Sequence, residues 1–209
     1  MYSKNNKRSD SWSPFKLRIE LGSGFLLFFA FIYFFDDCGI IAALVPAVIA
    51  HETGHILAIL LLGAKPKRLS ATLSGFSLDY SGDLNEIQEL LIAIAGPVFG
   101  LASAVLFAKL GKLIDSEYLI MSAGLGFVIN VFNLLPAIPL DGGHVLIFAL
   151  KAIFGAKIAQ TIAAIMGYLI SIAILVLGLY FILKGYGFAF FFAGLWLFIL
   201  QQNKSCKYS

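Results

Sequence analysis

The chain has 209 residues, of which 60% are hydrophobic and only 13% are charged. Soluble domains average roughly 45–50% apolar and about 25% charged residues, so this chain has too few polar side chains to cover a water-soluble globule. Its 15 basic and 12 acidic residues give a net charge of +3, which is too weak and scattered for a nucleic-acid-binding surface, so no nucleic-acid partner is expected. The composition predicts a multi-pass integral membrane protein in contact with a lipid bilayer.

Six apolar runs are long enough, or nearly so, to span a bilayer, which takes about 20 helical residues. In chain order they are Ile19–Phe35, Ile40–Leu62, Leu90–Leu110, Leu119–Leu140, Ile158–Leu183 and Tyr186–Leu200. The first follows a basic stretch, as in a signal peptide, but no small-residue cleavage site comes after it, so we interpret it as a retained span. The predicted fold class is an all-α polytopic membrane protein, one membrane-embedded domain over residues 1–209 with about six transmembrane helices.

The distribution of charge predicts an orientation. Basic residues in short loops favour the cytoplasmic side of a membrane. In a six-span layout, most basic residues, including those from Lys65 to Arg68 and both terminal clusters, fall on one side, and Asp36 and Asp37 fall on the other. Three lysines are exceptions: Lys109, Lys112 and Lys184. Both termini are therefore expected to be cytoplasmic.

The longest polar segment, Gly63–Glu89, lies between the second and third runs. Apolar and polar residues alternate over Leu69–Leu73 and again over Phe76–Tyr80, and Ser74-Gly75 between them is a turn signal. Such alternation is typical of strands joined by a turn. We therefore expect a short membrane-associated β-hairpin from Leu69 to Tyr80.

The second run contains the sequence His51-Glu52-Thr53-Gly54-His55. Side chains four residues apart lie on one face of a helix, about 6 Å apart along its axis, so both imidazoles can reach one tetrahedral Zn²⁺. Glu52 follows the first ligand, where its carboxylate can meet a metal-bound water instead of the metal. A fixed charge at the bilayer centre costs at least about 2.5–3.5 kcal/mol, which a bound cation offsets. The alternative is that the three side chains merely line a polar crevice or a proton path.

A catalytic zinc usually takes a third protein ligand. The candidates near the membrane are Asp36, Asp37, Asp141 and His144, and the first two lie at the far end of the second run. Pro136 and Pro139 disfavour helix before Asp141. Irregular backbone at membrane depth is tolerated only against protein or a water-filled cavity. The broken run either aims the Asp141 carboxylate inward or ends as a plain turn at the interface, and the pattern leaves both readings open.

The two motifs together resemble the site-2 protease family, the intramembrane zinc metalloproteases. One motif is His51–His55, and the other is N-x-x-P-x-x-P-L-D-G from Asn133 to Gly142. The resemblance covers Ile40 to about Gly143 and includes Ala95-Gly96-Pro97. The compact length is similar to that of the minimal microbial members, which have no PDZ or CBS domains.

The resemblance implies a three-helix catalytic core over about residues 40–143, preceded by the span 19–35 and followed by spans over about 158–183 and 186–200. It implies one Zn²⁺ per chain held by His51, His55 and Asp141, with Glu52 as the general base. Asn133 would assist at the substrate carbonyl or its oxyanion. The implied activity is hydrolysis of peptide bonds within or near transmembrane segments of other membrane proteins. An extended substrate could pair by strand addition with the exposed edge of the Leu69–Tyr80 hairpin.

Two positions depart from the family pattern. Gly100 stands where many members have asparagine, which leaves Gly96 and Gly100 as a close-packing helix face. His144 stands where arginine is common, and we interpret it as an interfacial or supporting side chain. Two other functions stay open: a metal-binding membrane protein of the same fold that does not cleave, and a metal or proton transporter. A peptidase with a glutamate ligand ranks below both, because no later apolar run contains a glutamate in its interior.

Overall fold

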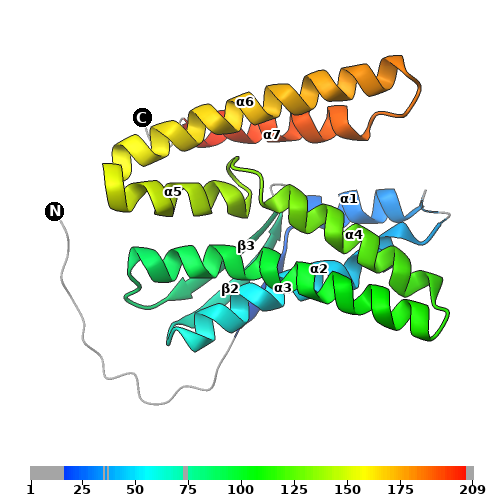
Figure 1. Cartoon of the computed structure of the whole chain (residues 1–209), viewed down its shortest axis with the longest axis horizontal. Coiled ribbons are helices and arrows are strands. Elements are labelled where there is room, and N and C mark those ends of the chain that lie inside the picture. The colour runs from blue at the N-terminus through cyan, green and yellow to red at the C-terminus, as the bar shows by residue number, and fades with distance from the viewer. Residues whose placement is uncertain (1–16, 35, 37, 73–74, 206–209) are drawn as a thin grey trace.

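The computed structural model describes residues 17–34, 36, 38–72 and 75–205. The amino-terminal basic cluster, Asp37 and the hairpin residues Leu73 and Ser74 lie outside the described residues. The described chain is mostly helical and carries one small sheet (Figure 1). Its elements are β1 (Arg18–Leu21), α1 (Ser23–Phe34), α2 (Ile40–Leu61), β2 (Lys65–Thr72), β3 (Gly75–Ser81), α3 (Glu86–Leu113), α4 (Glu117–Asn133), α5 (Asp141–Phe154), α6 (Ala156–Leu183) and α7 (Ala189–Ser205).

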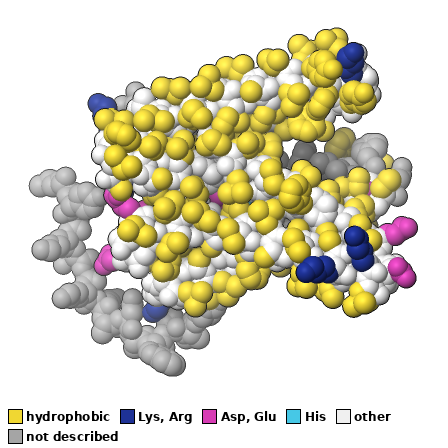
Figure 2. All heavy atoms as spheres, viewed as in Figure 1, with side chains coloured by type: hydrophobic (Ala, Val, Ile, Leu, Met, Phe, Trp, Pro, Cys, Tyr) yellow, Lys and Arg dark blue, Asp and Glu magenta, His cyan; other side chains and the backbone are white. Residues whose placement is uncertain are grey.

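Three helices within the described residues, α2, α3 and α6, are long and apolar enough to cross a membrane. Two shorter apolar helices accompany them, α4 and residues 189–202 of α7. Apolar side chains cover the middle of the face in Figure 2, and the charged side chains visible there lie mainly toward its two ends. Large apolar side chains that face outward in this way need lipid around them. The protein is therefore an integral membrane protein.

The first predicted span, Ile19–Phe35, is not one continuous helix. Its opening residues form β1, which pairs in parallel with β2 from Arg18 opposite Arg68 to Leu21 opposite Ala71. Only the 12 residues of α1 are helical, which is about 18 Å of helix against a hydrocarbon core of about 30 Å. Apolar content alone did not reveal the strand, because pairing with β2 decides its conformation.

The predicted hairpin is present and larger than expected. Strands β2 and β3 are antiparallel, with Leu69 opposite Leu78, and the sheet order is β1-β2-β3. Arg68 ties the three strands together on an exposed face, because its guanidinium lies 3.2 Å from Glu20 of β1 and 2.7 Å from Asp79 of β3. The fold is thus helical with a three-stranded sheet, where the sequence predicted an all-α protein with a two-stranded hairpin.

The fourth predicted span, Leu119–Leu140, is broken near its middle. Helix α4 ends at Asn133, and α5 begins at Asp141 after an irregular segment. Pro136 and Pro139 explain the break, since neither has a backbone N–H and each disfavours helix in the residue before it. Residues 141–154, which lie between two of the predicted spans, form helix α5. In Figure 1, α4 starts at one end of the molecule, α5 finishes at the other, and the break lies between them.

The helices pack as two groups. Helices α2, α3 and α4 pack against one another, and α5 joins α3 to the antiparallel pair α6 and α7 (Figure 1). Leu197 of α7 is fully buried and packs against Ala137 and Leu140 of the irregular segment. This contact holds the segment that precedes Asp141 against the last helix.

Candidate metal centre

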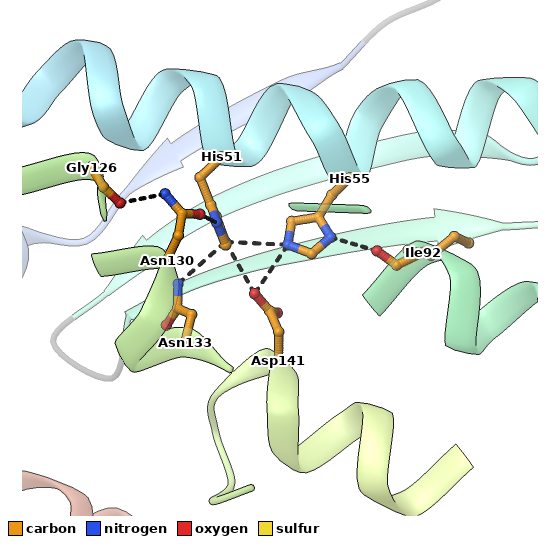
Figure 3. Close-up of polar contacts among 7 residues, drawn as sticks. All are labelled: His51, His55, Ile92, Gly126, Asn130, Asn133 and Asp141. Carbon is orange, nitrogen blue, oxygen red and sulfur yellow. Dashed lines mark hydrogen bonds and ion pairs between the residues drawn. The ribbon is translucent and has the colours of Figure 1, made fainter. Parts of the chain in front are cut away.

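Helix α2 places two histidines on one buried face. It runs without interruption through residues 40–61, so the residues at positions 51 and 55 are one turn apart. Their side chains are buried, and the two Nε2 atoms lie 3.3 Å apart. Both Nε2 atoms point away from α2 toward the start of α5 (Figure 3). The predicted pair of imidazoles is therefore brought together.

The partners of the Nδ1 atoms define the tautomer of each ring. His55 Nδ1 lies 2.8 Å from the carbonyl oxygen of Ile92 on α3. A carbonyl oxygen only accepts hydrogen bonds, so Nδ1 carries the proton and donates it. His51 Nδ1 lies 2.8 Å from Asn130 Oδ1 on α4, which is likewise an acceptor. With the proton on Nδ1, the neutral form of each ring has a lone pair and no hydrogen on Nε2.

Asp141, the first residue of α5, completes the cluster. Its Oδ2 atom lies 3.1 Å from His51 Nε2 and 3.4 Å from His55 Nε2. This oxygen is fully buried and receives no hydrogen bond from any described residue. The break in the fourth predicted span therefore turns the carboxylate inward, which was one of the two readings that the sequence left open.

These three atoms fit a divalent cation. The ligand atoms of His51, His55 and Asp141 lie within 4.8 Å of one another. In the tautomers defined by the Nδ1 partners, each of these atoms has a lone pair directed at the same point. Two atoms each about 2.0–2.1 Å from a tetrahedral Zn²⁺ lie roughly 3.3 Å apart. The observed separations of 3.1, 3.3 and 3.4 Å match this value, and two imidazoles with one carboxylate are a common zinc ligand set.

Glycines on α3 make room for this arrangement. A Cβ atom on Gly96 would lie 2.1 Å from His55 Nε2, and a Cβ on Gly100 would lie 2.1 Å from Asn130 Oδ1. Ordinary contacts begin at about 3.4 Å, so a side chain at either position would displace the group that it meets. The close-packing face expected from these two glycines is thus the surface on which the histidine ring and the asparagine amide rest.

A cavity of about 1030 Å³ opens beside the cluster. Its walls include Glu52 and Asn133, two residues predicted to act in catalysis. Asn133 Nδ2 also lies 3.3 Å from His51 Nε2, so its amide reaches the centre. His144 lines the same cavity, but it lies outside the cluster, and its ring stacks on Phe148 at 6.3 Å.

Strand β3 forms another wall of the cavity, from Gly75 to Tyr80. Burial raises the pKa of the Tyr80 hydroxyl, and the nearby Glu89 carboxylate raises it further. Tyr80 is therefore neutral at physiological pH and presents a hydroxyl that can donate or accept. Trp196 of α7 lies on the cavity wall as well, so the cavity extends from the sheet to the last helix.

Sequence reasoning missed Asn130. It is fully buried and contacts His51 directly, yet it belongs to no motif. The sequence did contain a feature that could have identified Asn130 as a site residue. An asparagine within an apolar run is costly in a membrane and rarely occurs there without a polar partner.

Known peptidases match this chain in both sequence and fold. A model of peptidase family M50 matches residues 107–178, which include Asn133 and Asp141. The structure resembles that of the site-2 protease from Methanocaldococcus jannaschii with a TM-score of 0.71 and 23% identity, covering 93% of this chain and 94% of that chain. The chain has the fold of a site-2 protease, and the resemblance predicted from its motifs is confirmed.

Two curated relatives are similar in sequence. The Synechocystis sp. protein sll0528, provisionally named a zinc metalloprotease, is 33% identical over 116 residues, 52% of this chain. The zinc metalloprotease MJ0392 from Methanocaldococcus jannaschii is 28% identical over 139 residues, 64% of this chain. The matches cover 31% and 40% of those two proteins, so the chain spans well under half the length of the relatives it matches.

Proposed function

We propose that this chain is an intramembrane zinc metalloprotease that hydrolyses peptide bonds within or near transmembrane segments of membrane proteins. The observation that carries the proposal is the convergence of His51 Nε2, His55 Nε2 and Asp141 Oδ2 in a buried site at the wall of a large cavity. The names of the two curated relatives support zinc and peptide hydrolysis. We assign one Zn²⁺ per chain to these three ligands.

The remaining residues of the site suit peptide hydrolysis. A zinc ion supplies Lewis acidity that activates a water molecule and polarises a carbonyl. The Glu52 carboxylate accepts one proton from the attacking water, whose oxygen bonds to the carbonyl carbon, and then gives that proton to the amine as the C–N bond breaks. The Asn133 amide donates a hydrogen bond to the oxygen that gains negative charge. Glu52 and Asn133 both line the cavity.

The same proposal includes six membrane crossings with both termini cytoplasmic. Helices α2, α3, α6 and α7 are four of them, and α4 with α5 forms a fifth, discontinuous crossing. The first lies in the segment that contains β1 and α1. Discontinuous helices are tolerated within membranes where the break lines a cavity, and Pro139 and Leu140 from the break do so here.

A substrate segment must be extended before its carbonyl can be attacked, because helical carbonyls are already hydrogen-bonded. Within the described residues, β3 is an edge strand that lines the cavity. An edge strand presents unpaired backbone groups to which an extended peptide can add. We propose that β3 pairs with the substrate close to the scissile bond.

Cysteine cross-linking tests this pairing. Ser77→Cys on β3, in a Cys38→Ser background, should form a disulfide with a cysteine placed near the cleavage site of a bound substrate. The control is Glu20→Cys on β1, the opposite edge of the same sheet, which should not. Equal cross-linking at both positions would refute the pairing.

The decisive experiment compares Glu52→Gln with the wild-type protein. Both should contain about one zinc per chain, whereas the variant should cleave a membrane-embedded reporter at least about 100-fold more slowly, because it has no general base. Glu117→Gln, the same change at the exposed start of α4, is the matched control and should behave as wild type. Wild-type cleavage by Glu52→Gln would overturn the assignment, and zinc binding without cleavage by any form would favour the non-catalytic alternative.

A further inference from the structure

Asn130 is a fully buried polar residue that the proposed chemistry does not use. It lies in the last turn of α4, and its amide makes two short contacts: Oδ1 is 2.8 Å from His51 Nδ1, and Nδ2 donates to the Gly126 carbonyl at 2.6 Å (Figure 3). A buried amide is costly unless its groups are paired. Here both ends of the amide are paired, and one partner is a predicted metal ligand.

The second contact fixes which way the amide points. The Gly126 carbonyl can only accept a hydrogen bond, so the NH₂ group of Asn130 must face it. The amide oxygen must then face His51, and an oxygen acceptor at that position requires the proton of the ring to be on Nδ1. The other tautomer would set two acceptors 2.8 Å apart. Asn130 therefore selects the tautomer whose Nε2 lone pair faces Asp141 and His55.

Helix α3 holds the amide in this place. Gly100 leaves a slot that the amide fills, since a Cβ there would lie 2.1 Å from Oδ1 and 2.4 Å from Nδ2. The two histidines thus differ in how they are anchored. His55 Nδ1 donates to the backbone carbonyl of Ile92, which no substitution removes. His51 Nδ1, in contrast, has the Asn130 side chain as its acceptor.

We propose that Asn130 is a positioning residue that fixes the tautomer and ring orientation of His51 for metal binding. The proposal rests on the zinc site proposed above. A residue that orients a metal-bound histidine through its second ring nitrogen typically contributes about 10–100-fold to metal affinity. Asn130 itself touches neither the metal nor the substrate.

Two near-isosteric substitutions separate this role from packing. Asn130→Leu removes the acceptor and should weaken zinc binding by about 10–100-fold. Asn130→Asp keeps an oxygen facing His51 Nδ1, and its neutral acid form also donates to the Gly126 carbonyl as the amide does, so zinc affinity should stay within about threefold of wild type. Ser122→Ala changes another fully buried polar residue of α4 and should leave zinc affinity unchanged. The measurement is zinc affinity by competition with a chelator, with the melting temperature of the metal-free protein recorded for each variant.

The outcomes are distinct. Equal losses in the aspartate and leucine variants would reduce Asn130 to a packing residue and refute the proposal, as would wild-type affinity in the leucine variant. If the leucine variant does not fold, Gly100→Ala provides the same test, because its new methyl group pushes the Asn130 amide away from His51. Zinc affinity should then fall by the same factor, and wild-type affinity would refute the proposal. Absence of zinc binding by the wild-type protein would instead refute the zinc site itself.

Discussion

Substituting Gly96 by alanine perturbs the metal centre without changing any predicted ligand. The new Cβ would lie 2.1 Å from His55 Nε2, about 1.3 Å inside the distance of about 3.4 Å at which ordinary contacts begin. The ring cannot turn aside in place, because its Nδ1 is hydrogen-bonded to the Ile92 carbonyl. It must leave the site, and the adjoining cavity offers room for it to do so.

The expected loss follows from the overlap. The zinc-bound form requires the ring in place and bears the strain, whereas the zinc-free form relieves it by moving the ring. Overpacking of this kind costs about 1–3 kcal/mol, and each 1.4 kcal/mol is tenfold in binding, so zinc affinity should fall about 5- to 150-fold. Chelator competition on the purified protein measures this directly.

Gly124→Ala is the matched control, because a Cβ at this helical glycine meets nothing within 4 Å. It makes the same chemical change and brings the same gain in helix propensity, but it should leave zinc affinity at the wild-type value. A folded Gly96→Ala variant that binds zinc as tightly as wild type would show that the His55 ring does not rest against Gly96, and the reasoning would fail.

Two further predictions concern the connection between α1 and α2. The proposed topology puts the exposed Cys38 on the outer face and Cys206 on the cytoplasmic face, so a membrane-impermeant maleimide added to intact cells should label only the former, and Cys38→Ser should abolish the labelling. Hydrogen bonds from the backbone N–H groups of Ile41 and Ile40 lower the pKa of Asp36 below its ordinary value of 3.8. Because the pKa is depressed in the folded state, the stabilisation is present above about pH 4 and disappears as the pH falls through the folded pKa. The melting temperature of wild type should therefore exceed that of Asp36→Asn at pH 6 and approach it near pH 3, and a constant difference would contradict this account.

Local patterns in the sequence predicted most of what lies within one element. The spacing of His51 and His55 on an apolar run is enough to bring their rings together, because helix geometry alone relates residues four apart. Pro136 and Pro139 predict a break for the same local reason. The alternation before Tyr80 predicts the hairpin. The metal-ligand, general-base and oxyanion roles stay predictions until they are measured.

Features that depend on distant partners were not predicted. The strand at Arg18–Leu21 exists because it pairs with β2, and its apolar residues read equally well as the start of a span. The Asn130 side chain is held by a hydrogen bond with His51, which is 79 positions away in the sequence, and by the space that Gly100 leaves for its amide. No periodicity along a single chain carries such contacts, so only the packed structure reveals them.

The position of His51 along its helix has a consequence for the products of the proposed cleavage. At 1.5 Å per residue, roughly 16 Å of α2 precede it and roughly 15 Å follow it, so His51 lies near the middle of this apolar helix. A bond hydrolysed at that depth divides a substrate helix into two stubs of about ten residues, half of what is needed to traverse the hydrocarbon. Neither stub can then anchor its fragment across the bilayer, and a single cut is sufficient to end the transmembrane state of the substrate.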